Sequence, residues 1–125
     1  MNENDITYII RGAIFKVYNE LGPGLLESIY EAALTYQIQQ DGLSVQRQVP
    51  LKVIYDGKAL PVNYQLDLLV ENKVIVELKS VETLSNLHKK QLLTYLKISG
   101  LKVGLLVNFN ANKIANNIIR IVNNF

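Results

Sequence analysis

The chain has 125 residues, of which 49% are hydrophobic, and this length and composition fit one ordinary domain with a single core. Thirteen Lys and Arg residues against eleven Asp and Glu residues give a net charge of +2, which is too small to indicate a nucleic-acid partner by itself. There is no Cys and only one His, which excludes disulfides, thiolate metal sites and multi-histidine zinc sites, so any metal would be held by oxygen atoms.

Two amphipathic helices are predicted at the start of the chain. Apolar residues recur at three- and four-residue spacing from Asp5 to Leu21, with a cap near Asn4 or Asp5. Gly22-Pro23-Gly24 ends this helix, because Gly favours the C-terminal cap and Pro cannot continue the helix. A second helical pattern runs from Leu25 to Gln40 and closes at Asp41-Gly42.

Glu27 lies in the first turn of the second predicted helix, on its apolar side. A carboxylate at that place gains roughly 0.3–1 kcal/mol from the helix dipole, which is enough to explain the residue. Alternatively, Glu27 projects toward the sheet and joins other carboxylates there. Glu31, one turn later, would then be its partner or substitute, and both interpretations stay open.

The middle of the chain predicts a run of strands. Short strands are expected at Ser44–Val49, Lys52–Tyr55 and Ala59–Val62, with a hairpin turn at Asp56-Gly57. A second hairpin joins Asn63–Val70 to Val74–Ser80. Three basic residues in this region would suit phosphates, but a solvated sheet face explains them as well, so they receive no role: Arg47, Lys52 and Lys58.

Three charged residues, Asp67, Glu77 and Lys79, interrupt the apolar second hairpin. Side chains alternate across a strand, so Glu77 and Lys79 share one face. A three-residue turn at Glu71-Asn72-Lys73 would place Asp67 opposite Glu77, with Cβ atoms roughly 4.5–5.5 Å apart. A two-residue turn would pair Asp67 with Leu78 and send it to the other face. Because buried carboxylates need a partner, the three-residue turn predicts a divalent cation between Asp67 and Glu77.

A third helix is predicted from Ser85 to Ser99, and Gly100 ends it. Gln91 and Tyr95 share its apolar face, and the Gln91 amide needs a hydrogen-bond partner there. His88 is a secondary candidate, since a lone His on such a face is more often structural. The remaining cations form a basic surface that matters only if nucleic acid approaches this side: Lys89, Lys90 and Lys97.

The chain is predicted to close with a strand and a helix. Lys102–Val107 has the fully apolar character of a buried strand, and Lys113–Asn124 has helical spacing. The predicted order is therefore α-α-β-β-β-β-β-α-β-α, an α/β (α+β) sandwich with a mixed central sheet flanked by helices, in one domain over residues 1–125. No apolar run approaches the ~20 residues of a membrane span and the polar start is unlike a signal peptide, so we expect a cytoplasmic protein.

Asp67 on one strand, Glu77-x-Lys79 on the next, and a following helix, strand and helix resemble the PD-(D/E)XK nuclease superfamily and its restriction-endonuclease-like core. Gly24-x-x-Glu27-x-x-Tyr30 resembles the motif that names the GxxExxY protein family, a branch of that superfamily, and the resemblance covers nearly the whole chain. Gln91-x-x-x-Tyr95 is similar to an element of the exonuclease-like branches. The chain departs from the pattern at Leu66, where the superfamily has a Pro that contributes no ligand atom.

The resemblance implies a Mg²⁺-dependent nuclease, with Mn²⁺ as a substitute, that hydrolyses phosphodiester bonds in DNA or RNA. It implies that Asp67, Glu77 and Glu27 hold the metal and that Lys79 positions or activates the attacking water, with Gln91 and Tyr95 in the same catalytic group. A hard cation prefers such carboxylate oxygens and stabilises the developing charge of a phosphodiester. A homodimer is a further expectation, since many nucleases of this type act on two strands.

Two other interpretations stay open. The chain is either a catalytically inactive nuclease-fold module that binds nucleic acid or protein, since one fold hosts many functions, or it holds a structural ion cluster in which Lys79 neutralises Asp67 and Glu77. Metal binding separates the ion cluster from the other two interpretations. Cleavage separates the nuclease from the binding module.

Overall fold

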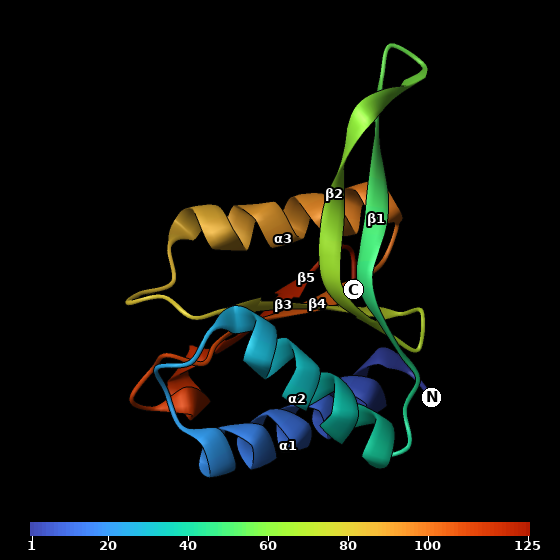
Figure 1. The fold of residues 1–125 in the computed structure, drawn as a ribbon. Coiled ribbons are helices and arrows are strands. Elements are labelled where there is room, and N and C mark those ends of the chain that lie inside the picture. The colour runs from blue at the N-terminus through green and yellow to red at the C-terminus, as the bar shows by residue number, and fades with distance from the viewer.

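One five-stranded mixed sheet separates two helical layers in the computed structural model, which describes residues 1–125 (Figure 1). Helices α1 (Glu3–Leu21) and α2 (Glu27–Gln40) cover one face of the sheet, and α3 (Asn86–Ser99) covers the other (Figure 1). The strands lie side by side in chain order: β1 (Val45–Tyr55), β2 (Lys58–Val70), β3 (Val74–Lys79), β4 (Val103–Asn108) and β5 (Ile118–Val122). Only β3 and β4 are parallel neighbours, and the predicted α/β (α+β) class is confirmed.

Each face of the sheet has its own apolar core, as strand alternation requires. Val76 and its same-face neighbours on β3 pack with α1 and α2 in the larger core. Ile75, one residue earlier, packs with Leu92 and Leu96 of α3 in the smaller core. Helix α3 approaches β4 closely at Gly104, where an added Cβ would lie 2.8 Å from a Leu92 methyl carbon. None of the helices has the length and apolar character needed to cross a membrane.

The observed helix ends differ slightly from the predicted ones. Asn2, rather than Asn4 or Asp5, caps α1, because its Oδ1 accepts a hydrogen bond of 2.8 Å from the Asp5 N–H. Helix α3 begins after Ser85, whose Oγ accepts from the His88 N–H while His88 Nδ1 accepts from the Ser85 N–H, both at 3.2 Å. This reciprocal arrangement gives His88 a structural role at the helix start.

Two long strands, β1 and β2, replace the four short ones expected between residues 44 and 70, and the expected strand Val74–Ser80 is observed as β3. β1 and β2 form one antiparallel ladder that runs from the pair Val45 and Val70 to the pair Tyr55 and Lys58. The predicted breaks between Ser44–Val49, Lys52–Tyr55, Ala59–Val62 and Asn63–Val70 are therefore wrong, apart from the turn after Tyr55. Pro50 is tolerated because β1 is an edge strand, and Pro61 lies in the part of β2 where the register shifts.

The predicted final helix, Lys113–Asn124, is also wrong. A single 3₁₀ turn at Ile114–Asn117 is followed by β5, which pairs antiparallel with β4 from Ile118 to Val122. β-branched residues dominate this segment and favour a strand. Pairing with β5 also covers an edge of β4 that would otherwise expose unpaired backbone groups. The helical spacing of the isoleucines was thus overridden by the free edge of the sheet.

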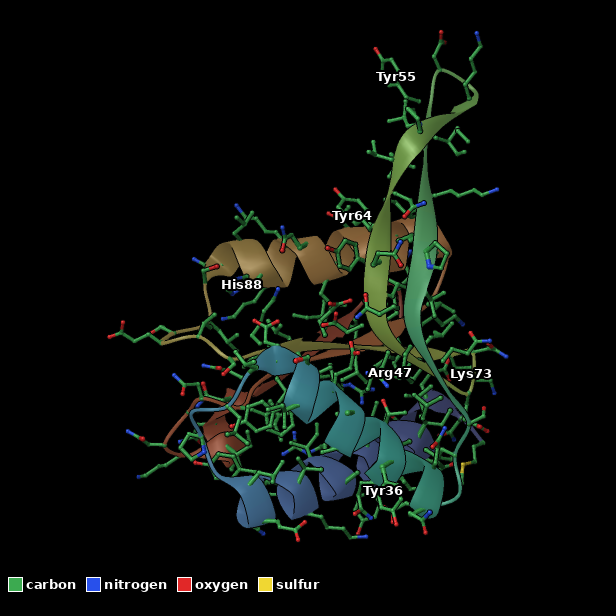
Figure 2. All side chains as sticks on the ribbon, in the orientation of Figure 1. Tyr36, Arg47, Tyr55, Tyr64, Lys73 and His88 are labelled. Carbon is green, nitrogen blue, oxygen red and sulfur yellow. The ribbon has the colours of Figure 1, made fainter.

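The outer part of β1 and β2 leaves the sheet. β2 pairs with β3 only at Leu68, Leu69 and Val70, whereas it pairs with β1 along its whole length. Residues 49–66 therefore form a two-stranded arm that projects past α3, with Tyr55 near its tip and Tyr64 beside the helix (Figures 1 and 2). The arm begins directly beyond Asp67.

Candidate active site

Asp67 and Glu77 meet where β2 separates from β3. Val70 pairs with Val74, so the turn holds three residues, as the carboxylate-pair interpretation requires. One position beyond Leu68 and Val76, the last ladder pair, hydrogen bonds from backbone N–H groups to the two carboxylates replace the backbone ladder. The Leu78 N–H donates to Asp67 Oδ2 at 2.9 Å, and the Asp67 N–H donates to Glu77 Oε1 at 3.3 Å. The predicted register is confirmed, and the two carboxylates end the β2–β3 ladder.

β2 rotates at Asp67. Leu66 packs in the core under α3, whereas Leu68 packs in the core with α1 and α2. Residues two apart on a regular strand face the same side, so this change of side requires a twist between them. Asp67 lies at the twist and is half-buried. It therefore lies where the strand passes from one helical layer to the other.

Glu77 is an acid in an unfavourable environment. Its side chain lies in the sheet with 7% of its surface exposed. Burial, followed by the neighbouring Asp67 charge, raises the pKa of the Glu77 carboxyl to about 9. The Lys79 charge lowers the pKa of Glu77 only weakly, because Lys79 forms no ion pair with it. The two ion pairs of the chain are Lys16–Asp41 and Arg47–Glu31. Lys79 thus forms no ion cluster with the acid pair, and Glu77 holds a proton unless a cation replaces it.

Glu27 approaches the pair from α2 without joining it. The Ser80 N–H lies 3.4 Å from Glu27 Oε2, and the Glu27 side chain is exposed. Glu27 and Asp67 both line a small cavity of about 160 Å³ between α2 and the sheet, together with Ser28, Glu31, Gln48 and Leu78. No three acidic or histidine side chains lie close enough together to enclose a metal ion. The predicted metal set therefore divides into a close pair and a third carboxylate across a cavity.

Gln48 links Asp67 to Glu31, the residue expected as a partner or substitute of Glu27, and the sequence had given Gln48 no role. Glu31 is buried and accepts hydrogen bonds from Arg47 Nη2 at 2.9 Å and from Gln48 Nε2 at 2.5 Å. The same Gln48 nitrogen lies 3.4 Å from Asp67 Oδ1. Gln48 has a φ of 49°, unusual for a residue in a strand, and this conformation directs the amide between the two carboxylates. The spacing of Glu31 one turn after Glu27 was the available signal.

The third side of the site comes from α3. Glu77 and Lys79 share the face of β3 that carries Ile75 toward α3. The Tyr95 ring contacts the Tyr64 ring at 4.7 Å, and burial with the charges of Glu77 and Asp67 among its causes raises the pKa of Tyr95 to about 12. Tyr95 is therefore a hydroxyl donor at all ordinary pH values. Gln91 is half-buried one turn earlier on the same helix.

Tyr30 explains the predicted Gly-x-x-Glu-x-x-Tyr motif structurally. Its hydroxyl donates to the Gly22 carbonyl at 2.5 Å and accepts from the Leu25 N–H at 3.1 Å, while its ring stacks on Phe109 at 4.5 Å. Gly24 has a φ of 99°, which favours glycine. The Tyr30 hydroxyl thus holds the loop before α2 in place, and the loop sets the position of Glu27 at the start of the helix.

The donor set fits a hard divalent cation. The site offers carboxylate oxygens with no thiolate, and the one His caps a helix elsewhere. Mg²⁺ keeps several waters and is usually bound through only one or two carboxylates, so a close pair is sufficient. A buried acid that is protonated for lack of a counter-charge is also what a cation would stabilise in its ionised form.

Comparison with known proteins gives one match. The family model described as the PD-(D/E)XK nuclease superfamily matches residues 4–121. No curated protein and no solved structure matches the chain. The family match includes every site residue named above and all of the sheet except the last residue of β5. The narrower GxxExxY assignment stays a prediction.

Proposed function

The chain belongs to the PD-(D/E)XK nuclease superfamily, and on that premise we propose that it is a metal-dependent nuclease hydrolysing phosphodiester bonds in DNA or RNA. The observation that supports this most directly is the pair formed by half-buried Asp67 and buried Glu77 at the end of the β2–β3 ladder. A structural role alone does not account for it, since neither acid has a cationic partner. The pair has the properties of a cation site.

In this proposal Asp67 and Glu77 hold Mg²⁺, or Mn²⁺ as a substitute, with Glu27 completing the set across the cavity. When bound, such a cation polarises a phosphodiester and stabilises its developing charge. Lys79 shares the face of Glu77 and has no ion-pair partner, so its amine is free to orient or deprotonate a water. Tyr95, protonated at neutral pH, and Gln91 supply hydrogen-bond donors for a phosphate oxygen from α3.

Gln48 extends the site as a positioning residue. Its amide donates toward Asp67 Oδ1 while the same nitrogen holds Glu31, so it orients the Asp67 carboxylate relative to α2. Hydrogen bonds from outside partners of this kind fix the geometry of metal ligands. The Arg47–Glu31 ion pair in turn fixes the position of Gln48's partner.

Cleavage of a mixed panel of single- and double-stranded DNA and RNA in Mg²⁺ tests the proposal. Wild type is expected to cleave at least one substrate, and Lys79→Ala is expected to lose that activity while keeping its fold. Lys113→Ala serves as the control, because Lys113 is exposed in the loop before β5. Equal behaviour of wild type and Lys79→Ala on every substrate would refute the nuclease.

Metal binding is tested separately by thermal unfolding. Mg²⁺ or Mn²⁺ is expected to raise the melting temperature, because a ligand that binds only the folded state stabilises it. Asp67→Ala is expected to abolish the shift. A melting curve unchanged by excess metal would contradict the site.

The second candidate is a nuclease-fold module that binds nucleic acid or protein without cleaving. Glu27 lies too far from Asp67 and Glu77 to form a group of three acids with them, and this favours the second candidate. It predicts a metal-induced rise in melting temperature with no cleavage of any substrate. A cytoplasmic location and a homodimer remain part of either proposal.

A further inference from the structure

The arm, residues 49–66, exposes apolar side chains that no part of the chain covers. Tyr55 is 72% exposed, Val62 68% and Ile54 60%, all in its outer half. An isolated two-stranded hairpin is only marginally stable in water, so the fold gains little from extending it. Exposed apolar and aromatic groups gathered on such an extension are typical of a binding surface.

Charge is divided between the two sides of the sheet. The arm and α3 together carry five basic residues and one acidic residue: Lys52, Lys58, Lys89, Lys90, Lys97 and Asp56. Helices α1 and α2 carry five acidic and two basic residues: Glu3, Asp5, Glu20, Glu27, Glu31, Arg11 and Lys16. Because the arm projects on the α3 side of the sheet (Figure 1), the charges of these elements favour a polyanion along the arm and α3 over one along α1 and α2.

The base of the arm is continuous with the acid pair. Tyr64 contacts Tyr95 of α3, and Leu66 directly precedes Asp67 on β2. Figure 2 shows Tyr64 beside α3 and Tyr55 near the far end of the arm. On β1, Tyr55 lies seven residues from Gln48, which is opposite Asp67, so a ligand that runs along the arm from Tyr55 past Tyr64 reaches Asp67 after about 23 Å, given roughly 3.3 Å per strand residue.

We propose that the arm and α3 form the binding surface for an unpaired nucleic-acid strand, with Tyr55 stacked on a base and Lys52 and Lys58 on the phosphates. The proposal rests on the nuclease function and names its substrate class. A duplex exposes base edges in its grooves but keeps the base faces stacked on one another, which leaves the Tyr55 ring without a base face to stack on. Unpaired bases offer an apolar face that aromatic side chains bind regardless of sequence.

Binding is measured by fluorescence anisotropy in EDTA, so that cleavage plays no part, with one labelled DNA strand alone and annealed to its complement. Wild type is expected to bind the single strand more tightly than the duplex. Tyr55→Ala is expected to weaken single-strand binding about 5- to 150-fold, the range for losing one base–aromatic stack. Tyr36→Ala is the matched control, because Tyr36 is 63% exposed on α2, on the acidic side.

The phosphate contacts are tested by salt dependence. The double variant Lys52→Ala/Lys58→Ala is expected to lower the slope of log K against log salt by about 1.4, or roughly 0.7 for each phosphate on a single strand. Lys113→Ala is expected to leave the slope unchanged. Equal affinity for strand and duplex, or equal effects of Tyr55→Ala and Tyr36→Ala, would overturn the inference.

This inference and the nuclease proposal fail separately. If wild type cleaves but the arm variants bind and cleave as wild type does, the substrate surface is wrong and the nuclease stands. If the arm variants lose binding but no substrate is cleaved, the surface stands and the nuclease fails. A dimer in solution that Tyr55→Ala dissociates, without any loss of strand binding, would assign the arm to a subunit interface and overturn the inference.

Discussion

Replacing Glu77 by Gln is expected to remove a large pH dependence of stability from the metal-free protein. The folded-state pKa of Glu77, about 9, lies above the ordinary carboxyl value of 4.5 that applies to the unfolded chain. The folded protein therefore holds a proton that the unfolded chain has already lost. The stabilisation is complete below about pH 4.5 and is lost as the pH rises toward 9.

The magnitude follows from one proton. Between those two pKa values the unfolding free energy falls by about 1.4 kcal/mol per pH unit on account of Glu77 alone. From about pH 5.5 to 7.5 the loss is about 3 kcal/mol, a large part of the 5–15 kcal/mol typical of a domain. Gln keeps the acceptor for the Asp67 N–H and gains an amide donor for the Asp67 carboxylate, so the variant lacks the titration without losing the contact.

Urea unfolding in EDTA across this pH range measures the effect. The difference in unfolding free energy between Glu77→Gln and wild type is expected to grow in favour of the variant by about 1.4 kcal/mol per pH unit. Glu82→Gln is the control, because Glu82 is exposed. Parallel stability curves for wild type and Glu77→Gln would show that Glu77 is ionised in the folded protein and would refute the reasoning.

Three further substitutions test the supporting structure. Gln48→Ala removes the amide between Glu31 and Asp67, and we expect cleavage or metal affinity to fall about 10- to 100-fold with an unchanged circular dichroism spectrum. Tyr30→Phe keeps the stacked ring but leaves the Gly22 carbonyl and Leu25 N–H without their partner, so urea unfolding should show a loss of about 1–3 kcal/mol. Gly104→Ala places a methyl group against Leu92 and should cost about 1–3 kcal/mol in the same assay.

Each of these substitutions has an outcome that contradicts its reasoning. Wild-type cleavage by Gln48→Ala would remove Gln48 from the positioning of Asp67. Wild-type stability of Tyr30→Phe would show that the loop before α2 is held by other contacts. A stable Gly104→Ala would show that α3 can move away from β4 without loss of packing.

The acid pair was predictable because it depends on one local feature. The count of residues between Val70 and Val74 fixes the turn, and the turn fixes which side chains face each other. The two helices before the sheet were predictable for a similar reason, since each has its own apolar periodicity and end signals. The sequence was sufficient to predict the structure wherever the spacing of residues within one segment determines it.

The remaining features depend on contacts between distant segments. β5 forms because β4 offers an unpaired edge, which local spacing in Ile118–Val122 does not reveal. The role of Gln48 depends on a left-handed backbone conformation and on a Glu from another element. The twist that separates Leu66 from Leu68 is defined by their packing in the two cores on opposite faces of the sheet. None of these three features can be predicted from the spacing of residues within one segment.

The twist at Asp67 makes the arm a separable part of the protein. Leu66 and Leu68 anchor β2 in opposite cores on either side of the acid, so the carboxylate is fixed before the arm begins. Residues added or removed at the arm's tip leave both anchors, and hence the acid pair, in place. The tip of the arm can therefore be exchanged for another sequence without moving the acid pair.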